Sequence, residues 1–487
     1  MKRLRAAAFL LTCLSGSVPG LSQTDVFEAD RAAAPETELD RFVFSRLEQL
    51  GLPPARPCSD AVFLRRVHID VIGTLPEPEE VRAFLEDDSP GKRARVIDQL
   101  LERKEFADYW AMKWGTLLRV KAEFPINLWP NAVQAYHQWL HASIQSNLPY
   151  DRFCRELLTS SGSCFRVPPV NFYRAVMGEQ PVDLAAAVAL TFMGARFDRW
   201  PEDRQAGMAA FFSRVGFKGT SEWKEQIVLF DASSPVPEHA AFPGGREITL
   251  SAVEDPRLVF ADWLITPENP WFTRNICNRI WFWLQGRGLV HEPDDIRADN
   301  PAVNPDLLAY LQRELVAANY DLKHIYRLIL NSSTYQLSSI PAESLPAERR
   351  AEALANLAFY QLRPLEAEVL IDAICQITDT TEEYQSAIPE PFTFIPENAR
   401  AIELADGSIN SPFLELFGRP ARDTGLESER NDEPTVPQRL HLLNSSHVMK
   451  KIGESKRLKR MLGQKQKRPG LAVDQLYLLI LSRHPSP

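Results

Sequence analysis

One polar loop of the sequence carries the side chains with the clearest capacity for chemistry. Asp294, Asp295 and Asp299 lie close together with Arg297 and Asn300. Closely spaced carboxylates could supply paired acid and base groups, or hold a hard cation such as calcium through oxygen. The alternative is structural, since Asp and Asn also cap helices and arginine ties loops by ion pairs. The absence of EF-hand spacing favours the structural alternative. The three aspartates remain candidate catalytic residues, and Arg297 and Asn300 candidate binding residues.

A second polar cluster alternates arginine with carboxylates on a segment punctuated by Gly and Pro. Its candidate binding residues are Arg419, Arg422, Glu427, Arg430 and Glu433. Such a network could grip a sugar or an anionic group through bidentate hydrogen bonds. Alternatively it locks the last helices onto the domain, which the sequence favours. If the aspartate loop is catalytic, it should face an open cleft together with this segment.

A histidine pair and an aromatic group are weaker indications of a functional site. His137 and His141 lie one helical turn apart, but the sequence indicates no third ligand, and we predict no metal site. Four aromatic residues at helical spacing could stack on sugar rings, although this spacing is more typical of a core. They are Trp271, Trp281, Phe282 and Trp283.

Capping signals and apolar periodicity predict a mainly α fold. Thr37 can cap a helix that Gly51 ends, and Asp321 can cap another. Ser89, with the proline that follows it, is predicted to open a helix. A long amphipathic helix is predicted over 305–319.

Three stretches of the sequence depart from amphipathic helical periodicity. The β-prone runs EQIVLF and REITLSA, between Ser221 and Val253, predict a small strand pair or linker. The apolar run Leu184–Ala195 has the length of a buried core helix. Proline and polar residues over Tyr384–Asn410 predict a surface loop.

Longer tracts closely resemble a planctomycete-type family of secreted proteins of unknown function, which pairs an N-terminal with a C-terminal domain. They are RRVHIDVIGTLPEPEEVRAFLEDD (65–88), ADYWAMKWGTLLRV (107–120), VNFYRAV (170–176), DPRLVFADWLITPENPWFTRNICNRIW (255–281), GRGLVHEPDDIRADNP (286–301), RPLEAEVLIDAI (363–374), FGRPARDTGLESERNDEPTVPQRLHLLN (417–444) and LYLLILSRHPSP (476–487). The resemblance covers most of the chain. It implies no activity that could be transferred.

The sequence departs from this family at one point. In relatives, a CxxCH loop stands between a Phe, Gly, Arg element and a Phe, Asp, Arg, Trp element; here Arg196 is joined directly to Phe197. Covalent c-type haem needs two thiols and an adjacent histidine. No histidine occurs between His141 and His239, and Cys164 is alone. We therefore expect no cofactor, which disfavours haem-linked electron transfer.

These observations divide the chain into four predicted segments. They are a signal peptide (1–22), an N-terminal helical domain (38–220), a linker with short strands (221–254) and a C-terminal helical domain (255–487). The predicted fold class is mainly α, with two helical domains joined by a short β-containing or irregular linker.

The first residues predict export to the periplasm, the cell envelope or the medium. Three basic residues precede the apolar run Ala6–Leu14, and the small residues Gly20 and Ser22 suit cleavage. The run is shorter than the ~20 residues that span a bilayer, so no transmembrane segment is expected after cleavage. The five remaining cysteines form no disulfide framework, although Cys154 and Cys164 could pair.

The net charge of -9 at pH 7 is unevenly distributed, because Lys450–Arg468 is basic. This run is either a solvated helix face or a strip for a sulfated or phosphorylated polymer. Export argues against nucleic acid as a partner. The expected partners are anionic polysaccharide or envelope proteins.

Three functional hypotheses follow. The leading one is a non-redox binding or scaffolding component of the envelope, linked to the processing of sulfated polysaccharide. The second is a carboxylate-dependent hydrolase or lyase acting on polysaccharide through the Asp294 loop. The third is haem-linked electron transfer.

Overall fold

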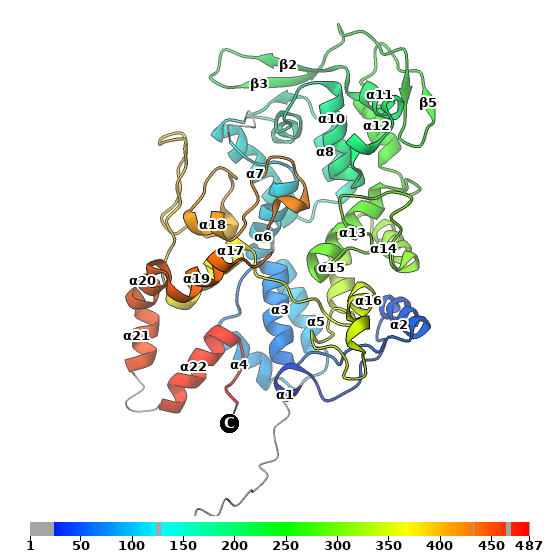
Figure 1. Cartoon of the computed structure of the whole chain (residues 1–487). Coiled ribbons are helices and arrows are strands. Elements are labelled where there is room, and N and C mark those ends of the chain that lie inside the picture. The colour runs from blue at the N-terminus through cyan, green and yellow to red at the C-terminus, as the bar shows by residue number, and fades with distance from the viewer. Residues whose placement is uncertain (1–23, 123–127, 432, 464–468, 487) are drawn as a thin grey trace, which may run out of the picture.

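Helices build most of the fold in the computed structural model, which describes residues 24–122, 128–431, 433–463 and 469–486 (Figure 1). The predicted mainly α fold class is therefore confirmed. The predicted leader, residues 1–22, lies outside the described residues.

The N-terminal region is an array of helices around α3 and α6. The elements are α1 (Thr24–Phe27), α2 (Glu38–Leu50), α3 (Asp60–Ile72), α4 (Pro78–Glu86), α5 (Lys92–Glu102), α6 (Lys104–Leu117), α7 (Pro130–Gln145), α8 (Tyr150–Thr159), α9 (Asn171–Arg174), α10 (Pro181–Val188) and α11 (Glu202–Ala209). Thr37 caps α2 in a capping box with Asp40, and Gly51 ends the helix in the left-handed region, as predicted.

One predicted helix start is wrong by a few residues. Ser89 does not open α5, which begins at Lys92 after Gly91. The backbone N–H and the hydroxyl of Ser89 both turn back to the Asp87 carboxylate instead. This local side-chain turn competes with the helix for the same polar groups.

The apolar run of the N-terminal region forms the predicted buried core helix. Helix α10 continues into a π-helical turn, Ala189–Met193, that is entirely buried. Gly194, with a φ of 60°, ends this turn. An added Cβ there would stand 2.6 Å from the Asn275 side-chain oxygen and 2.9 Å from the Pro293 carbonyl.

Two small antiparallel sheets lie beside the helices, at the top of Figure 1. The first has the order β1 (Gly162–Ser163), β3 (Gln226–Phe230), β2 (Val215–Gly219), and the second pairs β4 (Ala240–Ala241) with β5 (Glu247–Ile248). The run EQIVLF thus forms a strand as predicted. Its partners are β1 and β2 of the preceding region, however, and REITLSA contributes only the two residues of β5.

The C-terminal region is again helical, with long connections. The elements are α12 (Pro256–Leu264), α13 (Phe272–Gln285), α14 (Pro305–Ala317), α15 (Leu322–Leu330), α16 (Arg350–Ala355), α17 (Ala367–Thr378), α18 (Pro412–Leu416), α19 (Val436–Asn444), α20 (Ser446–Glu454), α21 (Lys456–Gly463) and α22 (Pro469–Leu481). Asn304 and Asp321 cap α14 and α15 through their side chains. Residues 384–410 form the predicted loop, with a single 3-10 turn at Ala401–Glu403.

A continuous apolar core joins the two regions through aromatic rings. The Trp110 ring of α6 lies 5.3 Å from Trp283 of α13 and 4.6 Å from Tyr326 of α15. Its indole N–H donates to the Val71 carbonyl at 3.0 Å. Side chains from both regions therefore share one interior.

Helices α19, α20 and α21 leave a band of apolar side chains in solvent, which we call the outer arm. The exposed apolar residues are Val436, Leu440, Leu442, Leu443, Met449, Ile452 and Leu462. In Figure 1 these orange to red helices stand at the edge of the molecule.

The structure bears on the predicted cysteine pairing and on membrane-spanning helices. All five described cysteines are free, so Cys154 and Cys164 do not pair. Among the described residues, no helix combines the length and the apolar character needed to cross a bilayer.

Replacing Trp110 by Ala is expected to lower the free energy of unfolding by about 3–5 kcal/mol, because the residue is 1% exposed and its loss leaves a cavity. Urea unfolding followed by circular dichroism measures the change. The matched control is Trp223→Ala, which removes a 68% exposed ring and should cost less than about 0.5 kcal/mol. Equal losses in both variants would contradict the assignment of Trp110 to the shared core.

Candidate functional site

The Asp294 carboxylate, the first candidate of the polar loop, is buried and fully engaged. Its Oδ1 accepts from Arg279 of α13 at 2.6 Å. Its Oδ2 accepts from the backbone N–H of Glu427 at 2.7 Å. The sequence-predicted polar clusters therefore do meet, but at Asp294 they meet inside the protein and not in an open cleft.

The other candidates of the loop lie nearer the surface and are held by ion pairs. Arg297 contacts Asp295 at 3.2 Å and Asp299 at 3.0 Å, and Arg199 contacts Asp295 at 2.8 Å. The Asn300 amide donates to two backbone carbonyls of the same loop. These contacts favour the structural alternative for the loop.

The loop is docked beside the direct junction of Arg196 and Phe197. The backbone N–H of Ile296 donates to the carbonyl of Gly194, two residues before Arg196, at 2.8 Å. The pair of Arg199 and Asp295 adds a second contact between the same two segments. The polar loop thus packs on the residues that flank the junction of Arg196 and Phe197.

The arginines of the second cluster are buried as well. Arg430 donates to Glu368 of α17 at 2.8 Å, and the Arg419 guanidinium lies 3.6 Å from the same carboxylate. Arg422 donates to the backbone carbonyls of Val120 and Ala405 at 3.2 and 3.1 Å. Glu433 is exposed, apart from the others.

Glu427 connects the polar clusters into one network. Its carboxylate accepts from the Trp283 indole at 3.1 Å and lies 3.5 Å from Arg279 and 4.0 Å from Lys113. Lys113 of α6 in turn contacts Glu366 at 2.5 Å. A buried charge network of alternating sign therefore runs from Asp294 to Arg419 and joins α6, α13, α17 and the 419–430 segment.

The network sets the protonation of its members. Burial would raise the pKa of Glu368, but the cations of Arg430 and Arg419 prevail and lower it to about 2. Burial and the neighbouring arginines lower the pKa of Arg422 to about 9. Because the side chains of this network are buried, they are not accessible to a ligand. The network instead holds the segments around it in position.

A polar cleft of about 410 Å³ lies further along α17, between the N-terminal and C-terminal regions, and sequence reasoning missed it. Its ionisable lining residues are Glu77, Glu80, Arg103, Glu105, Asp372, Asp379, Glu382, Arg400 and Arg457. Its neutral hydrogen-bonding residues are Thr74, Gln376, Thr380, Thr381, Tyr384 and Asn398. No residue of the Asp294 loop lines this cleft.

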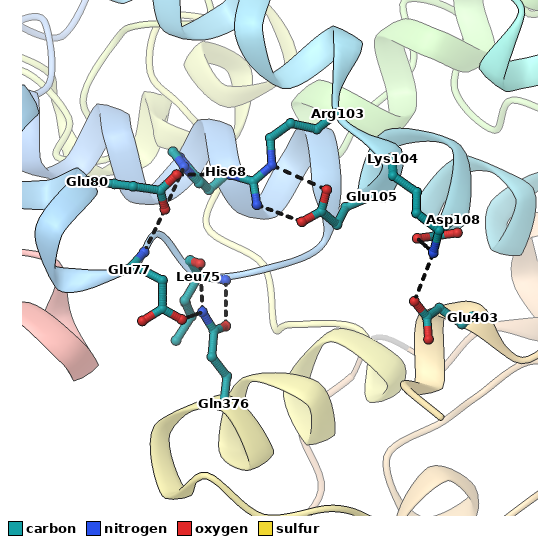
Figure 2. A network of polar contacts seen from close by, with 10 residues as sticks. All are labelled: His68, Leu75, Glu77, Glu80, Arg103, Lys104, Glu105, Asp108, Gln376 and Glu403. Atoms are coloured by element: carbon teal, nitrogen blue, oxygen red, sulfur yellow. Dashed lines mark hydrogen bonds and ion pairs between the residues drawn. The ribbon is translucent and has the colours of Figure 1, made fainter. Parts of the chain in front are cut away.

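The N-terminal wall of the cleft is a fixed set of ion pairs, shown in Figure 2. Glu80 accepts from the backbone N–H of Glu77 at 2.8 Å and from Arg103 at 3.0 Å. Arg103 also donates to Glu105 at 2.6 Å. Burial lowers the pKa of His68, behind Glu80, to about 4, so its ring is neutral at pH 7.

Gln376 of α17 connects the two walls. Its amide oxygen accepts from the backbone N–H of Leu75 at 3.2 Å, and its amide nitrogen donates to the carbonyl of Leu75 at 3.0 Å (Figure 2). The same nitrogen donates to Glu77 at 2.9 Å, which also accepts from Arg457 of α21 at 2.6 Å. Three parts of the chain thus meet at Glu77.

Asp372 is the most perturbed carboxyl of the cleft. Burial raises its pKa to about 7, although Arg400 at 3.8 Å and the backbone N–H groups of Ala401 and Ile402, at 2.7 and 3.1 Å, favour its ionised form. A carboxyl that titrates near neutrality inside a cleft is suited to proton transfer. Asp372 also accepts hydrogen bonds from the first two residues of the 3-10 turn Ala401–Glu403 and so holds that turn in place.

The sequence held one signal for this cleft. Two of the tracts that resemble the family contribute to its lining, 65–88 through four residues and 363–374 through Asp372. Nothing in either tract indicates which of its side chains face the other, because their separation in sequence is close to 300 residues.

The remaining sequence candidates have structural roles. His141 contacts Asp108 at 2.9 Å, and burial lowers the pKa of His137 to about 3. In the part of the chain that the structure describes, no three His, Cys, Asp or Glu side chains converge as a metal site requires. Trp281 and Trp283 are buried, and Trp271 and Phe282 pack on the same core, as expected.

Comparison with known families agrees with this two-region arrangement. Residues 38–216 match the family described as protein of unknown function DUF1549, and residues 256–487 match protein of unknown function DUF1553. The protein therefore belongs to the planctomycete-type proteins that combine these two domains. No curated protein and no solved structure matches the chain significantly.

Glu368→Gln is expected to lower the free energy of unfolding by about 3–5 kcal/mol at pH 7, because it leaves two buried guanidiniums without their carboxylate. The folded-state pKa of Glu368 is depressed, so its contribution is fully present above pH 4.5 and is lost as the pH falls toward 2. Urea unfolding from pH 7 to pH 3 should therefore show the difference from wild type shrinking below pH 4.5. The exposed Glu433→Gln is the control, and a pH-independent difference for Glu368→Gln would contradict the assignment.

Proposed function

We propose that this protein is an exported, non-redox binding component of the cell envelope that holds a hydroxyl-rich ligand, such as a segment of polysaccharide, in the polar cleft. The observation that carries the proposal is the lining of the cleft, where carboxylates, arginines, amides and hydroxyls from both regions converge on one space. Sugars are recognised by such sets of directed hydrogen bonds. Export rests on the predicted leader.

The charge of the cleft selects among polysaccharides. Six of the ionisable lining residues are carboxylates and three are arginines. A neutral or amino sugar fits this balance better than a sulfated one, which like charges would repel. A sulfated polymer is better matched to the outer arm, where Lys450, Lys456, Lys459 and Arg460 are exposed. Lys451 and Arg457 of the predicted basic strip turn inward to Glu382 and Glu77.

The sequence around Arg196 argues against electron transfer through covalent haem. The direct junction of Arg196 and Phe197 provides neither of the thiols that covalent haem would need. In addition, the backbone there packs closely on the 293–296 segment.

A second candidate function is carboxylate-dependent cleavage of the bound polysaccharide. Asp372 favours it, because the raised pKa keeps part of this carboxyl protonated at neutral pH, as a general acid requires. Other carboxylates of the cleft, such as Glu105, could then act as base. This candidate replaces Asp294 by Asp372 as the proton donor.

Thr381→Trp is expected to weaken glycan binding by tenfold or more, since Thr381 is an exposed lining residue and the indole would occupy the cleft. Binding of neutral, amino and sulfated oligosaccharides is measured by isothermal titration calorimetry. Ser45→Trp, on the exposed face of α2, is the matched control and should bind as wild type. If the folded wild-type protein binds none of these glycans, or if both variants bind equally, the proposal fails.

If the protein also cleaves its ligand, Asp372→Asn should abolish turnover while retaining binding, because the amide cannot deliver a proton. Wild-type activity should fall as the pH rises through about 7, where the Asp372 carboxyl loses its proton. Release of reducing ends or unsaturated products measures this. Binding without turnover at any pH from 5 to 8 would leave the binding role and exclude the catalytic one.

A further inference from the structure

A second cavity, of about 400 Å³, lies between α3, the segment 360–369 and the end of α22. Its walls are mainly apolar. The apolar lining residues include Val62, Ile69, Leu362, Leu365, Val369 and Leu481. Its volume is in the range of cavities that hold small molecules. Leu362, at its edge, is 76% exposed, which leaves an apolar side chain in solvent beside the opening.

The floor of the cavity is polar and rigid. The Asp70 carboxylate accepts from the Tyr335 hydroxyl at 2.8 Å, the Tyr360 hydroxyl at 3.0 Å and Arg363 at 2.8 Å. The guanidinium of Arg66 lies 3.7 Å from the centre of the Tyr360 ring. It donates to two backbone carbonyls at 2.7 and 2.9 Å. This floor is therefore held in place without a ligand.

The rim of the cavity carries two cations that lack a carboxylate partner among the described residues. Arg65 donates only to the Ile480 carbonyl at 2.8 Å and the Ser482 hydroxyl at 3.4 Å. Arg483 donates to the carbonyl of His484 and lies 5.1 Å from the Tyr477 ring. Burial without a counter-charge lowers the pKa of Arg65, which marks its environment as one that would gain from an anion.

The charge balance of the cavity is positive. Four guanidiniums line it, and they belong to Arg65, Arg66, Arg363 and Arg483. Its two carboxylates already have partners, because Asp70 pairs with Arg363 and Glu366 pairs with Lys113. Arg65, Arg66 and Arg483 thus have no ion-pair partner among the described residues, but Arg66 is held in the floor by two backbone carbonyls, so Arg65 and Arg483 are the cations left for a ligand.

We propose that this cavity binds an amphiphilic anion, a carboxylate attached to an aliphatic or aromatic body, with the apolar part between α3 and Val369 and the carboxylate at Arg65 and Arg483. Arginine is suited to such a headgroup because its planar fork donates two parallel hydrogen bonds to a carboxylate. The apolar walls exclude a polysaccharide or a free inorganic anion as the preferred occupant. The site is separate from the polar cleft, and it does not depend on the proposed function.

Decanoate is the test ligand, and decanol, which has the same chain without the charge, is the comparison. Isothermal titration calorimetry on the full chain should show decanoate binding at least tenfold more tightly than decanol. Arg65→Gln should weaken decanoate binding about tenfold and leave decanol unchanged, since one charge-assisted contact is lost. The double variant Arg65→Gln/Arg483→Gln should bring the two ligands to equal affinity.

Arg313→Gln, on the exposed surface of α14, is the matched control and should bind both ligands as wild type. Ile69→Trp tests the apolar part, because the indole fills the cavity and should weaken both ligands. Circular dichroism verifies that each variant is folded. Equal affinity of the wild type for decanoate and decanol, unchanged binding in the double variant, or no binding by the folded wild-type protein would each overturn the proposal.

Discussion

The placement of the two domains depends on neutralising charges that have been taken out of water. An ion removed from solvent costs several kcal/mol unless an opposite charge and hydrogen bonds replace its hydration. In this protein Lys113 of the DUF1549 domain has its partners, Glu366 and Glu427, in the DUF1553 domain. Neither domain can therefore shift without leaving an unpaired charge in the interior. The network thus fixes the relative position of the two domains more strictly than apolar contact alone would.

Helix α17 connects the charge network with both the polar cleft and the apolar cavity. Its first residues and the residue before it supply Glu366 and Glu368 to the buried charge network. Asp372 and Gln376, further along, line the polar cleft, whereas Val369 lines the apolar cavity. One element thus borders three sites of different chemistry. A change in how α17 sits on α6 would alter the width of the cleft and of the cavity together.

Local features of this fold could be predicted from the sequence, and long-range ones could not. The cap at Thr37 and the cap at Asp321 involve residues three positions apart, and both were predicted correctly. Asp294 also lies in a short polar motif, but its partners are Arg279 and the backbone of Glu427, 133 residues away. Once it is buried, such a motif is no longer accessible to a ligand and serves to hold distant segments together. The sequence does not encode that distinction locally.

The attachment of the outer arm has a consequence for access to the cleft. Lys451 of α20 is bound to Glu382 at 2.9 Å, and Arg457 of α21 to Glu77 at 2.6 Å, while many apolar side chains of α19–α21 face solvent. Lys451 and Glu382 are buried, so salt screens their ion pair little, whereas Arg457 and Glu77 are partly exposed and their pair weakens with salt, over a Debye length of about 8 Å at physiological ionic strength. Higher ionic strength should therefore loosen α21, which contributes Arg457 to the cleft, more than α20, and amide hydrogen exchange of the two helices at low and high salt would register the difference.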